Sequence, residues 1–256
     1  MSADYRNWMP KEVVIGLGAG TVMLTAAAAG LTFSKKKHLA IAAGAGAALT
    51  GAAAAWAGVV YETLSYDGKR KVAKRITDGI ADCVAIPDGG IGLDIGCGTG
   101  ALTIACAKRN PKAKMVGIDR WGIGLSNGSK SLCETNAAEE GVENAEFCYG
   151  DAADLDFPDG TFDAVTSNYV YHLIKWHNKQ DLLRETLRVL KKGGTFAIHD
   201  VFARNHYGDI RKFMQEMRDA GFERVSIYDT TKGEFMSPGE AAVLLLKDSA
   251  ILCGVK

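Results

Sequence analysis

Glycines and aspartates with the spacing of a cofactor-binding site lie near the middle of the chain. The segment "DIGCGTG" places Asp94 two residues before Gly96, and Asp119 follows 19 residues after Gly100. Glycines let a backbone approach a bound nucleotide closely, and an acid at this distance can hold ribose hydroxyls. The pattern therefore predicts a nucleotide-type cofactor, although a tight strand-to-helix turn without a ligand also uses such glycines.

The elements that must position these residues alternate between strand and helix. Short apolar runs predict strands at residues 91–96, 114–119, 162–168 and 194–201, with another inside residues 144–152. Helical patterns separate or flank them at residues 72–84, 99–110, 124–140 and 179–192. The C-terminal part predicts a helix, a turn and a strand over residues 213–229, and one more strand within residues 240–256.

This order of elements predicts an α/β fold with a doubly wound, mostly parallel, seven-stranded sheet. In such a sheet the three acids all lie at the carboxyl ends of strands, so they come to one edge: Asp94, Asp119 and Asp151. Ligands bind at the carboxyl edge of open α/β sheets. The sequence therefore predicts one crevice with three acids around it.

An earlier glycine stretch, "EVVIGLGAGTVML", begins at Glu12 and has a different context. No Asp or Glu lies between Glu12 and Glu62, so no acid is available for ribose hydroxyls. Instead, Val13 to Ser34 and Leu39 to Tyr61 are free of charge, and each run can cross a bilayer core of roughly 30 Å as a helix. A short basic turn, "KKKH", separates the two runs.

These runs predict an α-helical transmembrane hairpin as the N-terminal membrane-anchoring part, residues 1–61, before a catalytic domain of residues 62–256. Small residues recur at four-residue spacing, as at Gly16 and Gly20, and allow helices to approach closely, within the hairpin or between chains. Three alternatives stay open: a cleaved signal peptide, a buried helical pair of a soluble protein, and a hairpin that dips into one leaflet.

Composition excludes several classes of function. Thirty basic and thirty acidic residues cancel, which gives no sign of a nucleic-acid partner. Six scattered cysteines include no Cys-x-x-Cys, and no paired histidine spacing accompanies them. We therefore expect neither a metal site nor a disulfide framework.

Four motifs together resemble one known family. "LDIGCGTG", "GID", "GDAADLDFPDGTFDAV" and "LRVLKKGG" occur in the order and spacing of class I S-adenosylmethionine-dependent methyltransferases, close to the branch that acts on quinones and other small molecules. The resemblance covers about residues 66–256. It implies S-adenosylmethionine as cofactor, S-adenosylhomocysteine as product, and the Rossmann-like fold already expected.

The resemblance also assigns roles to individual residues. The first motif, which wraps the methionine part of the cofactor, comprises Asp94, Gly96, Cys97, Gly98 and Gly100. By the resemblance, Asp119 binds the ribose hydroxyls. Arg120 or Trp121, which follow it, would flank the adenine, and Asp151 and Ala152 would contact the edge of the adenine. Asn168 and Tyr169 match the end of the fourth strand, where cofactor and acceptor meet. Tyr66 matches loosely an aromatic residue ahead of the first strand.

Methyl transfer needs a general base only if the acceptor is protonated. We expect the catalytic candidates among Tyr169, His172 and Asp200, with Tyr171 and His199 as neighbours. The plainer alternatives are that Tyr171 and His172 pack or bond to backbone, and that Asp200 caps a helix. Trp176 and His177 are weaker candidates, and Cys97 is expected to be a buried thiol.

The sequence thus predicts a membrane-anchored methyltransferase with its catalytic domain on the cytoplasmic side, where the cofactor is made. An anchor suggests a small lipophilic acceptor, such as a lipid, quinone, phenol or thiol. Two other functions stay open: an NAD(P)-dependent oxidoreductase, and a non-catalytic membrane scaffold that binds S-adenosylmethionine. No Tyr-x-x-x-Lys pair supports the oxidoreductase.

Overall fold

The computed structural model describes residues 3–34, 36–122 and 128–256. These residues divide into two compact units, Arg6–Lys74 and a second unit of residues 3–5 with Arg75–Lys256. The predicted domain boundary after residue 61 stays a prediction. The second long helix runs past this position to Leu64.

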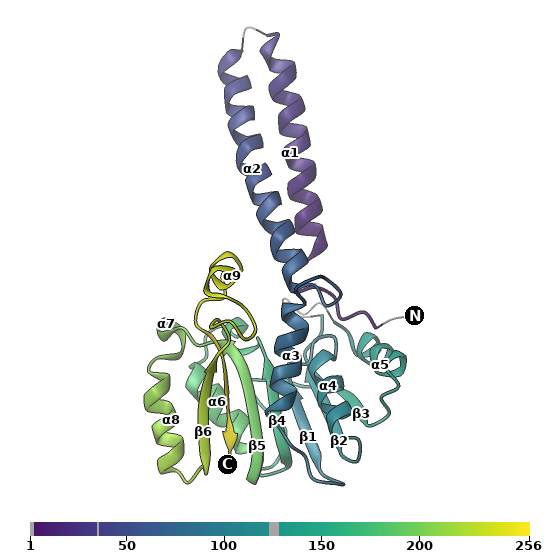
Figure 1. The fold of residues 1–256 in the computed structure, drawn as a ribbon, viewed down its shortest axis with the longest axis vertical. Helices are drawn as coiled ribbons and strands as arrows, with labels where there is room; N and C mark the ends of the chain where they lie inside the picture. The colour runs from purple at the N-terminus through teal and green to yellow at the C-terminus, as the bar shows by residue number, and fades with distance from the viewer. Residues whose placement is uncertain (1–2, 35, 123–127) are drawn as a thin grey trace. The chain divides into compact units, whose positions relative to one another are not determined.

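The first unit consists mainly of two long helices, α1 (Lys11–Thr32) and α2 (Lys37–Leu64), which lie side by side (Figure 1). The Thr21 and Thr50 hydroxyls meet at 3.0 Å, and a Cβ added at Gly51 would lie 3.4 Å from the Thr21 methyl group. A Cβ added at Gly16 or Gly20 would have no described atom within 4 Å, so the close contacts within the pair are made at glycines of α2. By length and composition both helices could cross a membrane.

Within the described residues, the second unit is built on a seven-stranded sheet in the order β3-β2-β1-β4-β5-β7-β6. Its strands are β1 (Ile91–Ile95), β2 (Lys114–Asp119), β3 (Ala145–Tyr149), β4 (Phe162–Asn168), β5 (Leu190–Val201), β6 (Arg224–Asp229) and β7 (Ser249–Val255). The first five run parallel, whereas β7 is antiparallel to both of its neighbours, β5 and β6. The predicted mostly parallel sheet is confirmed.

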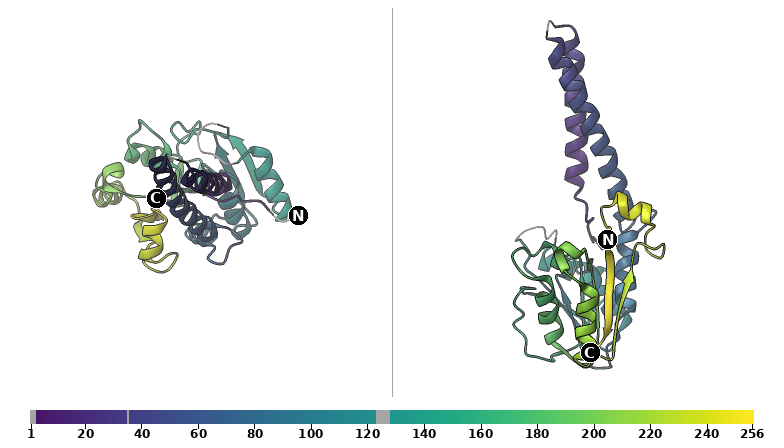
Figure 2. Two further views of the ribbon diagram at one scale, coloured as in Figure 1. Left: turned by 90° about the horizontal axis from the view of Figure 1, so that it is seen from above. Right: turned by 90° about the vertical axis from the view of Figure 1, so that its left-hand side faces the viewer.

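Helices cover both faces of the sheet (Figures 1 and 2). They are α3 (Val72–Asp82), α4 (Ala101–Arg109), α5 (Lys130–Glu139), α6 (Lys179–Arg188), α7 (Arg204–Tyr207), α8 (Ile210–Asp219), α9 (Pro238–Val243) and a 3₁₀ turn, η1 (Tyr171–Leu173). Alternate residues of the central strands point to opposite faces. Leu93 and Ile95 therefore join the core under α6 and α8, while Asp94 turns toward α4.

Two predicted helix boundaries differ from the structure. The helix expected at residues 179–192 ends at Arg188, because Leu190 already pairs with Phe162 as the start of β5. The helix expected from residue 124 begins at Lys130, where the Ser129 side chain caps it by accepting a hydrogen bond from the Leu132 amide. Residues 123–127 lie outside the described residues.

Candidate functional site

The glycine loop between β1 and α4 has the left-handed backbone that favours glycine. Gly96, Gly98 and Gly100 have φ angles of +72°, +57° and +84°. A Cβ at Gly96 would lie 2.3 Å from a Val170 methyl group, and one at Gly100 would lie 3.0 Å from the Phe147 ring. At Gly98, by contrast, no described atom lies within 4 Å of that position. The loop is therefore packed on two sides and open at Gly98, as a backbone that receives a ligand requires.

Asp94 lies beneath this loop and is buried. Its carboxylate accepts hydrogen bonds from the Thr103 hydroxyl at 2.6 Å and from the Thr166 hydroxyl at 3.1 Å. Burial raises the pKa of Asp94 to about 7, although both hydroxyls act in the opposite direction. These contacts join β1, β4 and α4 at the loop, so Asp94 organises the predicted cofactor site from below. Direct contact with a cofactor ammonium stays a prediction.

This buried carboxyl group should make folding stability depend on pH. Because its folded-state pKa of about 7 exceeds the ordinary value of 3.8, its favourable contribution is complete below pH 3.8 and is lost as pH rises to 7. We expect Asp94→Asn, which cannot ionise, to gain stability over the wild type across this range, by at most about 4 kcal/mol. Thermal unfolding of both proteins between pH 4.5 and 8 measures it. Parallel pH profiles would contradict the expectation.

Asp119 and Trp121 hold the open side of the loop. The Asp119 carboxylate accepts from the Gly98 amide at 2.9 Å and from the Trp121 amide at 3.0 Å. The Trp121 indole donates to the Gly98 carbonyl at 2.7 Å, and its ring meets Tyr149 edge to face. Both polar groups of Gly98 are therefore tied to the end of β2. Trp121 is buried against the loop, and its predicted contact with adenine stays untested.

The other residues that are predicted to contact the adenine lie just after β2 and β3. Arg120 forms an ion pair with Asp151 at 3.3 Å, and both side chains are about half exposed. Asp151 also accepts from the Ala153 amide, which closes a turn around the buried Ala152. The structure brings this pair to the same sheet edge as Asp119. Tyr66 belongs to the other compact unit, and its role stays a prediction.

The strongest candidate for proton transfer is a histidine–aspartate pair after β4 and β5. His172 Nδ1 lies 2.7 Å from Asp200 Oδ1, and the His172 amide donates to the other carboxylate oxygen at 3.2 Å. Asp200 is fully buried, and although burial raises its pKa, the contacts with His172 lower it below the ordinary value. An ionised Asp200 fixes the Nδ1–H tautomer, leaving the Nε2 lone pair as the proton acceptor. No described residue bonds to Nε2.

Tyr169 belongs to a buried polar chain next to this pair. Its hydroxyl lies 2.7 Å from Ser249 Oγ, which lies 2.8 Å from His199 Nε2, and His199 Nδ1 lies 2.8 Å from Asn168 Oδ1. Burial raises the pKa of Tyr169 and lowers that of His199 to about 3. Both groups therefore stay neutral at pH 7, which favours a positioning role over that of a base. Tyr169 has a φ of +56°, a strained value for a tyrosine.

Four other candidates lie outside the histidine–aspartate pair and the polar chain of Tyr169. The Tyr171 hydroxyl pairs with Thr186 in the core, in line with the packing alternative. Trp176 is 98% exposed, and His177 bonds only to a nearby backbone carbonyl among its described partners. Asp200 does not cap the next helix, since α7 has Ala203 at its N-cap. Cys97 is buried, and burial raises the pKa of its thiol, as expected for an unreactive cysteine.

Sequence reasoning missed the partners that surround the predicted residues. Ser249 starts β7 opposite Val201, and the Thr230 hydroxyl reaches Ser249. The Tyr207 hydroxyl is buried without a hydrogen-bond partner among the described residues, and burial and the charge of Asp200 raise its pKa. Only the antiparallel return of β7 brings Ser249 to this edge, and no local motif marks it.

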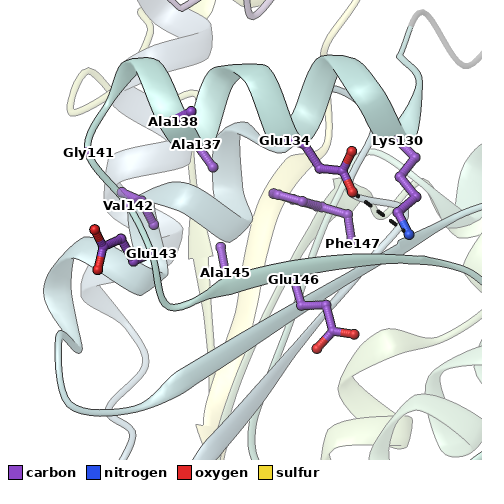
Figure 3. Close-up of a pocket in the computed structure, with 10 residues that line it drawn as sticks. All are labelled: Lys130, Glu134, Ala137, Ala138, Gly141, Val142, Glu143, Ala145, Glu146 and Phe147. Carbon is purple, nitrogen blue, oxygen red and sulfur yellow. Dashed lines mark ion pairs between the residues drawn. The ribbon is translucent and has the colours of Figure 1, made fainter.

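A separate hollow of about 440 Å³ lies between α5 and β3 (Figure 3). Lys130 and Glu134 form an ion pair in its lining, which also includes the Phe147 ring. None of the predicted site residues lines it. The candidate site is accordingly the glycine loop with the acids and polar residues at the carboxyl edge of the sheet. Among the described residues, no group of three or more His, Cys, Asp or Glu could hold a metal ion.

A parallel sheet with a glycine loop after β1 and an acid at the end of β2 defines a Rossmann-like cofactor-binding protein. The family comparison is more specific: a methyltransferase domain matches residues 87–239, which include the loop, all three acids and the His172–Asp200 pair. The chain belongs to this methyltransferase domain family. Membership implies S-adenosylmethionine as the cofactor, and the opening at Gly98 with Asp119 beside it fits that group.

Curated relatives match part of the chain. Ajmaline N-methyltransferase of Rauvolfia serpentina is 35% identical over 108 residues, 41% of this chain and 34% of the relative. The 27-O-demethylrifamycin SV methyltransferase of Amycolatopsis mediterranei (strain S699) is 32% identical over 129 residues, 49% of this chain and 44% of the relative. The matched region thus spans less than half the length of either relative.

Solved structures support the fold over a larger part of the chain. The [4+2]-cyclase SpnF superposes with a TM-score of 0.53 at 25% identity, over 72% of this chain and 80% of the cyclase. The geranyl diphosphate C-methyltransferase of Streptomyces coelicolor A3(2) superposes with a TM-score of 0.56 at 15% identity, over 76% and 83%. At this identity the second likeness shows the fold alone.

Proposed function

We propose that this protein transfers the methyl group of S-adenosylmethionine to a hydroxyl group of a small lipophilic acceptor, with His172 as general base. The observation that carries the proposal is the 2.7 Å contact between His172 Nδ1 and the buried Asp200 carboxylate. A hydroxyl is a poor nucleophile until its proton leaves, whereas a neutral amine already offers a lone pair. A base held in one tautomer is therefore most useful to a hydroxyl acceptor.

The chain's own groups divide the work. When bound, the cofactor supplies an electrophilic methyl group. Asp119 would hold the ribose hydroxyls, and the open backbone at Gly98 would receive the methionine part. His172 Nε2 takes the proton of the acceptor hydroxyl and returns it to solvent after transfer. Asp200 stabilises the protonated His172 ring. Tyr169, whose hydroxyl is held by Ser249, would form the side of the acceptor site next to His172.

A membrane location for the acceptor is the second part of the proposal. Apolar side chains such as Ile15, Met23, Ile41 and Leu49 are 65–74% exposed on α1 and α2, where water would be unfavourable surroundings and lipid is favourable. Because S-adenosylmethionine is made in the cytosol, the methyltransferase domain faces the cytoplasmic side in this proposal. Gly16 and Gly20 leave an open face on α1 through which two chains could pair.

The function can be tested with the full chain in detergent and S-adenosylmethionine labelled in its methyl group. We expect labelled product with a lipid extract that contains phenols, quinols and sterols, and none with the water-soluble fraction. Identifying the product by mass spectrometry would locate the methyl group on oxygen. Binding of NADH without binding of S-adenosylhomocysteine would instead support an oxidoreductase, and binding of the cofactor product without any turnover would support a scaffold.

Membrane attachment can be tested by placing charge on the two helices. We expect the wild type to float with liposomes after washing at high pH, and the Met23→Asp/Leu49→Asp variant to stay largely in the soluble fraction, because each buried charge costs about 3 kcal/mol in a bilayer. A matched variant, Asp88→Asn, changes an exposed charge outside the hairpin and should float as the wild type does. Equal flotation of the double variant would argue for a hairpin that does not enter lipid.

A further inference from the structure

Residues 3–5 precede the apolar helices in sequence but pack within the methyltransferase unit. The Asp4 amide donates to Asn136 Oδ1 at 2.8 Å, and Asn136 Nδ2 donates to the Asp4 carbonyl at 2.9 Å. The side-chain amide of Asn136 therefore binds this backbone through the same two bonds that a neighbouring strand would use. We call residues 3–5 the N-terminal strap.

The strap also reaches the glycine loop. Asn136 Nδ2 donates a second bond to the Thr99 carbonyl at 3.0 Å, and the Thr99 hydroxyl donates to the Tyr5 carbonyl at 3.1 Å. Thr99 lies between Gly98 and Gly100, so its backbone sets the turn of the loop. Asn136, Thr99 and the strap thus form a closed set of hydrogen bonds behind the loop.

Burial makes this arrangement depend on the strap. Asn136 is 1% exposed, and the Asp4 amide is the donor to its side-chain oxygen among the described residues. If the strap left, the Asn136 side-chain oxygen and the Thr99 hydroxyl would each lose the partner that the folded chain supplies, and the loop would lose these restraints. The strap does not plug the loop, because no described atom lies within 4 Å of the position a Cβ would take on Gly98.

We propose that the N-terminal strap is a structural part of the cofactor site, acting through Asn136 as a positioning residue that holds Thr99 and the turn of the glycine loop. Cofactor affinity then depends on residues that precede both apolar helices. The inference rests on the proposed function only in taking S-adenosylmethionine and S-adenosylhomocysteine as the ligands of the loop.

The test measures S-adenosylhomocysteine binding to the full chain by calorimetry, together with the KM for S-adenosylmethionine and kcat. We expect deletion of residues 1–5 and the single change Asn136→Ala each to weaken binding about 5- to 20-fold, since each removes two or three hydrogen bonds that preorganise the loop. The KM should rise in step while kcat at saturating cofactor stays the same. Combining both changes should cost less than the sum of the two single effects, because both remove the two bonds between Asn136 and Asp4.

Two point variants keep the outcome clear if the deletion impairs folding. Thr99→Val removes only the hydroxyl donor to Tyr5 and should weaken binding about threefold. Thr135→Val removes an exposed hydroxyl next to Asn136 that bonds within α5, and it should bind as the wild type does. Wild-type affinity in the strap deletion and in Thr99→Val would overturn the inference, as would tighter binding, which would make the strap a plug. Absence of binding by the wild type would instead refute the proposed function.

Discussion

Replacing His172 with glutamine is expected to lower kcat by about 10²- to 10⁴-fold, the usual contribution of a positioned general base. Glutamine can still donate a hydrogen bond to the Asp200 carboxylate, which keeps the buried charge partnered, but it has no basic nitrogen. Cofactor binding should be unchanged, because no described hydrogen bond joins His172 to the glycine loop. Initial rates at saturating cofactor, together with the Kd for S-adenosylhomocysteine, measure the two effects separately.

Asp200→Asn tests whether Asp200 holds His172 in the tautomer that can act as a base. The asparagine oxygen can still accept from Nδ1–H, but its amide nitrogen can equally donate to Nδ1, which moves the ring proton to Nε2 and removes the base. We expect a loss of at least about 10²-fold in kcat, and a double variant no slower than His172→Gln alone. His177→Gln, an exposed histidine five residues away, should keep full activity. Unchanged kcat in His172→Gln would show that the acceptor needs no base.

The sheet and its acidic edge could be predicted because both depend on local sequence patterns. Each parallel strand is a short apolar run bounded by glycine or aspartate, and the carboxyl ends of parallel strands meet at one edge whatever the loops do. The sequence therefore predicts Asp94 and Asp119 at the same edge, whatever the strand order is. The family resemblance added the cofactor.

Element boundaries were less predictable where two signals overlap. "LRVLKKGG" continues the helical spacing of α6, yet Leu190 pairs with Phe162 and opens β5. The chain changes from helix to strand within two residues, Val189 and Leu190, both of which are buried. Tertiary packing against β4 decides between two patterns that the local sequence supports equally.

The polar partners of the site could not be predicted, because they come from distant parts of the chain. Ser249 reaches His199 across 50 residues, and Asn136 reaches Asp4 across 132. Each contact requires the antiparallel insertion of β7 or the docking of the strap, and no sequence spacing encodes either one. Burial, which depends on the same tertiary packing, keeps Tyr169 and His199 neutral, and residue type alone does not predict it.

Loss of the Asp119 side chain is expected to abolish most cofactor binding. A carboxylate that accepts two hydroxyl hydrogen bonds contributes about 1.5–3 kcal/mol for each, so Asp119→Ala should weaken S-adenosylhomocysteine binding on the order of 10²-fold or more. The same change frees the Gly98 and Trp121 amides, which the carboxylate now holds. The expected loss therefore combines direct contact with loop support.

Two further variants separate these contributions. Asp119→Asn keeps an acceptor for the Gly98 amide but loses the charge, and we expect it to retain the folded loop while binding S-adenosylhomocysteine about tenfold more weakly than the wild type. Trp121→Phe removes the indole donor to the Gly98 carbonyl but keeps an aromatic ring near Tyr149 and for the predicted adenine contact. It therefore tests loop support and should lose about fivefold or less. If Trp121→Phe weakened binding as much as Asp119→Ala, the acid would act by shaping the loop. A large loss confined to the two Asp119 variants would instead mean that the carboxylate itself contacts the ribose.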